Sequence, residues 1–233
     1  MTVSGTPVEN TLTEEEVWAT LRTVIDPELD RSIVDLGFVH DVKVSGTDVR
    51  VELRLPTYWC APNFSWLMVA DAREAILALP GVGRASVELV DHHAAAEVTE
   101  AVNAGRSFQE AFAEHATGGL EDLRRTFRRK AFLVRQERVL CSLGHPAPAD
   151  LTLKDLPSTP EAQAYLAIRA ELGLDCSPGA PVVTDAEGRA VQDVNAHLRH
   201  ARLVRISLES NTALCRGLFD ARYGEQEASG GSR

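Results

Sequence analysis

The chain has 233 residues, a formal net charge of −10 and an apolar content of 44%. These values are typical of a globular protein with room for one large domain or two small ones. The acidic balance argues against a general nucleic-acid-binding protein, because neutralising phosphates needs an excess of Lys and Arg on at least one face. No apolar run reaches the roughly 20 residues of a membrane span. The first ten residues lack the pattern of a signal peptide, so a cytoplasmic protein with reduced cysteines is expected.

The first half of the chain predicts a small α/β domain. The expected elements, in chain order, are a helix over 13–26, strands over 38–44 and 49–55, a helix over 63–79 and a strand over 85–90. Thr13 and Glu16 form a capping-box pattern at the start of the first helix, and Pro27 disfavours a helical residue before it. The two first strands alternate apolar with polar residues around a turn-like segment, which predicts an antiparallel hairpin in a small mixed sheet.

The second half of the chain predicts a mostly α-helical region. Its expected helices cover 96–105, 107–115, 119–140, 160–172 and 210–224, the last capped by Ser210 or Asn211. A small strand pair is expected from the segments 180–185, 187–190 and 202–208. The polar ends, 1–12 and 225–233, are expected to be disordered tails. The predicted fold is therefore an α+β domain over 13–95 followed by a helical domain over 96–224.

The predicted strand order places Cys60 at one edge of the sheet. Antiparallel pairing brings the end of the second strand beside the start of the first, which the segment with Asp26 and Glu28 precedes. A helical crossover makes the second and third strands parallel, so the third strand ends at the same edge and is followed by His92. Ligands bind at the carboxyl ends of parallel strands in α/β sheets. A thiol, carboxylates and an imidazole at this edge predict a soft-metal or thiol site.

Two cysteines are candidate sulfur ligands. Cys60 precedes Pro62, the expected first helical residue, and the unpaired amides of a helix start favour the thiolate that binds metals. The alternative is a small apolar filler, because a lone cysteine is often buried for packing. Cys215 falls in the last expected helix and is either packed core or a second sulfur ligand.

Three segments resemble the metal-sulfur cluster assembly domain of the PaaD and SufT type. They are VIDPELDRSIVDLGFVHDVKV, LPTYWCAP and ILALPGVGRASVEL, within residues 13–92. The resemblance implies a maturation factor, not an enzyme, that binds iron or an iron-sulfur cluster transiently, with zinc as an alternative metal. It also implies a client metalloenzyme, such as a multicomponent di-iron oxygenase. The family's reactive cysteine corresponds to Cys60 and its acidic motif to Asp26 and Glu28. The family pattern has Thr four residues before the cysteine, whereas Thr57 is three before it.

A basic amphipathic helix is expected in the second half. Residues 123–138 contain seven Arg or Lys and one acidic residue. Its candidate partner-binding residues are Arg124, Arg125, Arg128 and Arg129. The functional interpretation is a docking surface for an acidic client, or less favourably for nucleic acid. The simpler interpretation, which we favour, is a solvated face paired with the many carboxylates of this chain.

Two other functions are considered. One is a metal-free adaptor or chaperone-like module that uses the Cys60 edge and the basic helix to bind proteins. The other is a thiol-dependent enzyme with Cys60 as nucleophile and His92 as base, which is the least favoured because the chain has none of the common hydrolase or nucleotide-binding motifs.

Overall fold

The computed structural model describes residues 12–112, 119–144 and 151–230, which form two compact units. Of these residues, unit 1 contains 12–26, 31–112 and 215–230. Unit 2 contains 27–30, 119–144 and 151–214. The long helix α7 (Val194–Gly230) contributes residues to both units. Each unit is described by itself below.

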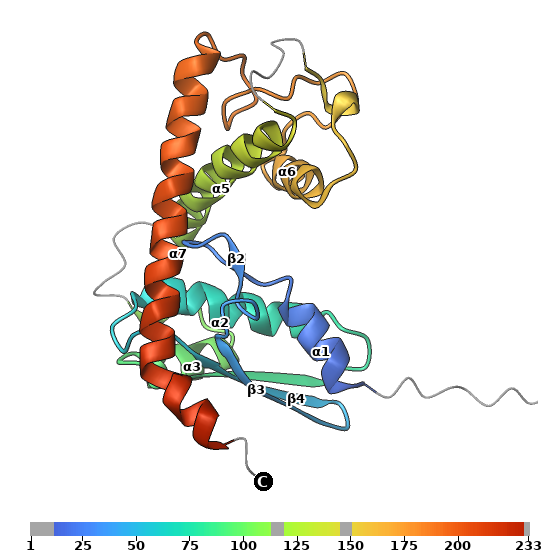
Figure 1. Cartoon of the computed structure of the whole chain (residues 1–233). Helices are drawn as coiled ribbons and strands as arrows, with labels where there is room; N and C mark the ends of the chain where they lie inside the picture. Colours follow the sequence, from blue (N-terminus) through green and yellow to red (C-terminus); the bar gives the residue numbers. More distant parts are fainter. Residues whose placement is uncertain (1–11, 113–118, 145–150, 231–233) are drawn as a thin grey trace, which may run out of the picture. The chain divides into compact units, whose positions relative to one another are not determined.

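Unit 1 is built on a three-stranded sheet in the order β3-β4-β5 (Figure 1). β3 (Val39–Ser45) is antiparallel to β4 (Asp48–Arg54), and β4 is parallel to β5 (Arg84–Val90). Alternate residues of β4 and β5 are buried, as at Val49 and Val51, so one face of the sheet lies in the core. The predicted hairpin and the predicted parallel crossover are both confirmed. A two-stranded ladder of β1 (Ile25–Asp26) and β2 (Arg31–Ser32) precedes the sheet.

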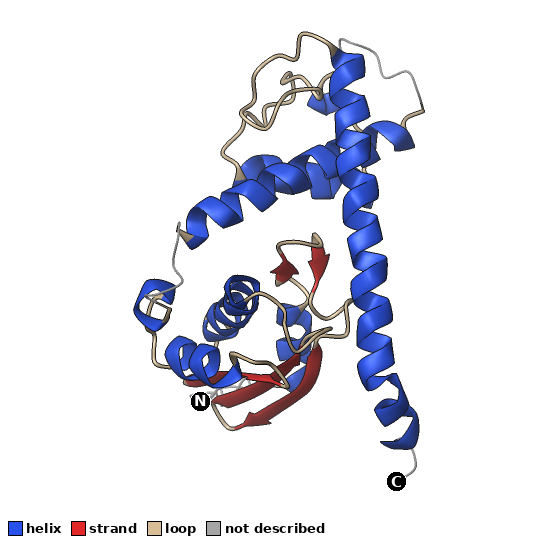
Figure 2. Cartoon of the chain, turned by 90° about the vertical axis from the view of Figure 1, so that its left-hand side faces the viewer, coloured by secondary structure: helices blue, strands red, loops and turns tan. Residues whose placement is uncertain are grey.

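Two helices pack together over the buried side of this sheet (Figure 2). α2 (Pro62–Leu77) begins with the predicted proline and buries one side, including Trp66 and Ile76. α1 (Glu14–Leu21) begins with the predicted capping box at Thr13. The prediction that this first helix reaches Asp26 is wrong, because Ile25 and Asp26 leave the helix and pair with β2.

Two further helices extend unit 1 beyond residue 95. α3 (Ala95–Asn103) covers the free edge of β5, where the Asn103 amide bonds both the N–H and the C=O of Val87 at 3.1 and 2.9 Å. α4 (Phe108–Ala111) places Phe108 against Trp66, with ring centroids 5.5 Å apart. Residues 96–112 therefore pack with unit 1, although they were expected in the helical domain. Independent folding of residues 13–95 stays a prediction.

Unit 2 is mostly helical, as predicted. Its elements are α5 (Leu120–Ser142), the 3-10 helix η1 (Leu153–Asp155), α6 (Pro160–Glu171) and the part of α7 up to residue 214. The core contains Phe132 and Tyr165, and the buried Gln136 amide donates to Tyr165 and to the carbonyl oxygens of Val182 and Thr184. These bonds satisfy polar groups that burial would otherwise leave unpaired.

Several predictions for the second half differ from the structure. The strand expected over 202–208 is wrong, because these residues lie inside α7, as do the expected caps Ser210 and Asn211. Segments 180–185 and 187–190 do not form a strand pair: they share an isolated bridge between Thr184 and Ala190, and the N–H of Asp185 donates to the carbonyl oxygen of Arg189 at 3.0 Å. Residues 225–230 continue α7, whereas a tail was expected there. Residues 1–11, 113–115 and 231–233, which carry the other tail predictions and the end of one predicted helix, lie outside the described part. In the part that is described, no helix has the length and hydropathy needed to cross a membrane.

Candidate functional site

Cys60 lies in the loop that joins β4 to α2, at the carboxyl end of the strand. Its thiol is partly exposed, and its Sγ lies 3.3 Å from the Oγ1 of Thr57. The same hydroxyl oxygen accepts a hydrogen bond from the N–H of Trp59 at 3.3 Å. The thiol therefore faces a hydroxyl at the sheet edge and is accessible from solvent. The spacing of three residues between Thr57 and Cys60, which departs from the family pattern, still brings the two side chains together.

His92 holds the backbone of the Cys60 loop from the end of β5. Nδ1 of His92 accepts a hydrogen bond from the N–H of Ala94 at 3.1 Å, so the ring proton is on Nε2. Nε2 then donates to the carbonyl oxygen of Cys60 at 2.7 Å and lies 3.2 Å from the hydroxyl of Ser65. The ends of the second and third predicted strands, β4 and β5, lie at the same edge, as expected. At this edge the side chain of His92 bonds the backbone of Cys60.

The environment of His92 favours its neutral form. The ring is 5% exposed, and this burial is the main reason that the pKa of His92 is lowered from 6.5. The hydrogen bond to Cys60 opposes the shift, while His93 and Arg222 add smaller lowering effects on the same pKa. The proton on Nε2 points at the carbonyl oxygen, so the ring is not placed to remove the proton of the thiol. A ligand role for His92 would require these hydrogen bonds to break.

An exposed aromatic cluster lies beside the thiol. Trp59 is 75% exposed and Tyr58 is 45% exposed. The Trp59 ring stacks on His93 with centroids 5.4 Å apart, and the N–H of His93 donates to the carbonyl oxygen of Tyr58 at 3.0 Å. Large exposed aromatic side chains are common in surfaces that bind other proteins.

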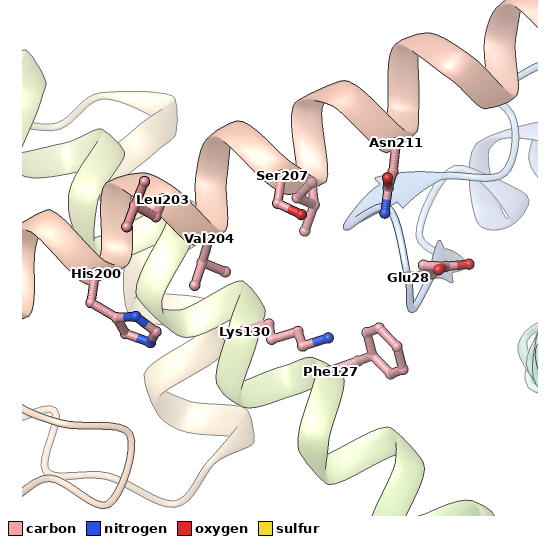
Figure 3. Close-up of a pocket in the computed structure, with 9 residues that line it drawn as sticks. Glu28, Phe127, Lys130, His200, Leu203, Val204, Ser207 and Asn211 are labelled. Carbon is pink, nitrogen blue, oxygen red and sulfur yellow. The ribbon is translucent and has the colours of Figure 1, made fainter.

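The two predicted carboxylates have different surroundings. Asp26 is 5% exposed and pairs with Arg31 in the β1–β2 ladder of unit 1. Glu28 lines an open cavity of about 280 Å³ in unit 2. Figure 3 shows Lys130 and Phe127 from α5 facing residues of α7 across this cavity.

Within residues 12–112, 119–144 and 151–230, no group of three or more His, Cys, Asp and Glu side chains is placed to hold a metal ion. Cys215 is half-buried on α7, and all four cysteines are free of disulfides. Ligand roles for Cys60, Asp26, Glu28, His92 and Cys215 therefore stay predictions.

The basic helix is confirmed as α5, and carboxylates of unit 2 pair with much of its charged face. Arg125 lies 3.6 Å from Asp122, and Arg129 lies 2.7 Å from Glu187. Arg128 lies within 3.8 Å of both Glu121 and Glu171. Arg124 is half-buried. These pairs support the simpler interpretation of a solvated face, while a partner-binding role for the four arginines stays a prediction.

Other residues of the site were not singled out from the sequence. Ser65 and the aromatic pair Tyr58 and Trp59 belong to the segment around Cys60, and two large aromatic residues in a loop are a usable signal. Arg222 reaches this region from a position 131 residues after its partner Asp91. No short-range sequence pattern indicates such a contact.

Comparisons with known proteins agree with the predicted family. The family model described as iron-sulfur cluster assembly protein matches residues 14–89. An iron-sulfur cluster carrier protein of Synechocystis sp. is 37% identical over 78 residues, which cover 34% of this chain and 22% of that protein. A protein of the same name from Deinococcus radiodurans is 37% identical over 68 residues, covering 29% of this chain and 19% of that protein. The chain thus spans about a fifth of the length of these curated relatives.

A shorter relative matches over nearly its whole length. An uncharacterized protein of Methanocaldococcus jannaschii is 32% identical over 90 residues, which cover 38% of this chain and 93% of that protein. A solved domain of unknown function, DUF59, from Bacillus anthracis is 29% identical, with a TM-score of 0.31, over 33% of this chain and 73% of that one.

Unit 1 is an α+β domain with a small mixed sheet, and the Cys60 thiol lies in the loop at the carboxyl end of β4. The chain belongs to the iron-sulfur cluster assembly protein family through residues 14–89. This confirms the predicted resemblance.

Proposed function

We propose that the protein is a cytoplasmic maturation factor that carries iron or an iron-sulfur cluster on Cys60 and delivers it to a client metalloenzyme. The observation that supports this most is the partly exposed Cys60 thiol, 3.3 Å from Thr57. It lies in the family-matched part of the chain, on a loop whose backbone is fixed by His92. A partly exposed thiol on a fixed loop at a strand edge can bind a metal and release it to another protein.

Cys60 has the chemistry that such a cargo needs. Thiolates are the ligands that iron-sulfur clusters prefer, and they also bind zinc, the alternative metal. In this proposal the cluster is cargo, and the protein that delivers or receives it supplies other ligands. His92 positions the loop, while Asp26, Glu28 and Cys215 are secondary candidate ligands. The partial exposure of Cys60 leaves a path for the second protein to approach.

The proposed client is an enzyme with an iron centre, such as a multicomponent di-iron oxygenase. The resemblance to PaaD-type domains suggests this class of client, and the family membership agrees with a role in cluster assembly. Capture of the tagged protein from its host, followed by identification of bound proteins and metal analysis, tests this choice. Recovery of no metalloenzyme under anaerobic conditions would count against it.

Anaerobic metal analysis tests the role of Cys60 directly. The parent protein and its Cys60→Ser variant are incubated with ferrous iron and sulfide, desalted, and analysed for iron, zinc and sulfide. The Cys176→Ser variant is the matched control, because Cys176 is a free and exposed thiol of unit 2. We expect the control to retain the metal content of the parent and Cys60→Ser to lose most of it. Equal content in all three proteins would contradict the proposal.

The exposed aromatic cluster favours a second candidate, a metal-free adaptor that binds proteins at the same edge. Tyr58 and Trp59 present a large apolar surface beside the thiol. An adaptor of this kind would lose client capture in Trp59→Ser and keep it in Cys60→Ser. A carrier would keep client capture in Cys60→Ser and in the control Cys176→Ser, but the client would not be activated when Cys60 is replaced.

A further inference from the structure

The last turns of α7 contact both strand ends that flank the Cys60 loop. The Arg222 guanidinium donates from Nη1 to the carbonyl oxygen of Leu55 at 3.2 Å and from Nη2 to that of Asp91 at 2.5 Å. Leu55 follows β4 and begins the Cys60 loop, while Asp91 follows β5. One planar side chain with fixed donor geometry therefore joins the ends of two parallel strands.

Asp91, which Arg222 contacts, directly precedes His92, the residue that bonds the backbone of Cys60. Asp91 has a φ of +54°, in the left-handed region that few non-glycine residues adopt. Its carbonyl oxygen is bonded to Arg222, and its carboxylate accepts a hydrogen bond from the hydroxyl of Tyr223 at 3.4 Å. The next residue, His92, donates to the carbonyl oxygen of Cys60. Two side chains of α7 thus fix the turn that positions His92.

Aromatic packing secures this end of α7 within unit 1. Phe219 is buried against Phe38, with ring centroids 5.6 Å apart, and its ring packs over Gly37, where a Cβ atom would lie 3.4 Å from it. Tyr223 is also buried, and the guanidinium of Arg54 lies 5.1 Å from its ring centroid. This packing holds the end of α7 where the side chain of Arg222 reaches the ends of β4 and β5.

We propose that Arg222 is a positioning residue of the Cys60 site, acting through the ends of β4 and β5. The importance of this role for cluster transfer rests on the proposed function, whereas the positioning itself does not. Residues 215–224 lie far outside the family-matched segment 14–89. The C-terminal helix of this chain therefore completes a site whose thiol belongs to the family domain.

Hydrogen exchange and alkylation of the metal-free full-length chain test this role. The variants are Arg222→Ala and Arg222→Lys, and the matched control is Arg216→Ala. Arg216 lies on the same helix in unit 1 and donates to the carbonyl oxygen of Asp35, which is not part of the Cys60 loop. The first measurement is the exchange rate of the His93 N–H, which is bonded to Tyr58. The second is alkylation of Cys60 by iodoacetamide relative to Cys176 in the same molecule.

We expect Arg222→Ala to speed exchange of the His93 N–H by about tenfold, because the variant loses both hydrogen bonds that Arg222 makes to the strand ends. Cys60 alkylation should also accelerate relative to Cys176. Arg222→Lys should restore part of both effects, because an ammonium can keep one of the two bonds, and Arg216→Ala should match the parent. If Arg222→Ala does not fold, the lysine variant decides. Parent-like exchange and alkylation in Arg222→Lys and in any folded Arg222→Ala would overturn the proposal, whatever the metal content of Cys60→Ser.

Discussion

Replacing His92 by Phe tests how the Cys60 loop is held. The substitution keeps a ring of similar size but removes the hydrogen bonds at 2.7 Å to Cys60 and at 3.1 Å to Ala94. Each such bond contributes about 0.5–1.5 kcal/mol net, so we expect a loss of about 1–3 kcal/mol in the free energy of unfolding. Urea unfolding followed by circular dichroism measures this loss as a lower midpoint at constant slope.

The matched control is His93→Phe, because that ring is exposed and stacks on Trp59. A surface change of this kind should alter the free energy of unfolding by no more than about 0.5 kcal/mol. A loss in His92→Phe as small as in the control would refute the anchoring role of His92.

The pH dependence gives a second, independent readout of the same side chain. The pKa of His92 is lowered from 6.5, mainly by burial, so the unfolded chain takes up a proton at a pH where the folded protein keeps the ring neutral. The stabilisation from His92 is therefore present above about pH 6.5 and falls as the pH drops below this value. We expect the stability difference between the parent and His92→Phe to shrink between pH 7.5 and pH 5.5. A difference that grows on acidification would contradict the assignment of the neutral ring.

Two further stability predictions concern the packing of each unit. Phe219→Ala should lower the free energy of unfolding, measured in urea, by about 3–5 kcal/mol, because it removes a buried aromatic ring. Leu218 is exposed, so the control Leu218→Ala should lower it by less than about 1 kcal/mol. Arg135→Met should cost about 3–5 kcal/mol, since it leaves the Asp30 carboxylate, 4% exposed, without the guanidinium 2.6 Å away. Arg189→Met, which breaks exposed pairs, should cost at most about 1 kcal/mol by the same measurement; equal losses in these two arginine variants would contradict the buried pair.

Local sequence patterns predicted the elements of unit 1 well because each has one buried side. Apolar and polar residues alternate strictly over 49–55, which indicated the second strand of the hairpin, whereas the pattern of the first strand is broken where β3 has its register shift between Val39 and Asp41. Pro62 marked the first turn of α2. The first helix was predicted too long, because the apolar pattern of a helix continues to residue 25. In the structure, pairing with β2 keeps Ile25 and Asp26 in an extended conformation. In α7 the apolar-rich segment 202–208 is short enough to be compatible with a strand, and the structure shows instead that it lies within a helix of 37 residues.

The site was predictable only as far as strand order determines it. The parallel crossover placed the ends of β4 and β5 together, which correctly brought Cys60 and His92 to one edge. The sequence could not show that both ring nitrogens of His92 are engaged, since this depends on the conformation of the turn after Asp91. The contribution of Arg222 depends on where a distant helix packs, which periodicity does not indicate.

Cluster transfer measures the central claim most directly. The parent, Cys60→Ser and Cys176→Ser proteins are each treated with ferrous iron and sulfide without oxygen, desalted, and mixed with an apo acceptor protein that gains visible absorbance when it receives a cluster. We expect the parent and Cys176→Ser to load the acceptor at the same rate and Cys60→Ser to be slower by at least about tenfold, which corresponds to about 1.4 kcal/mol of activation free energy. Transfer by Cys60→Ser at the rate of the parent would show that this thiol does not carry the cargo.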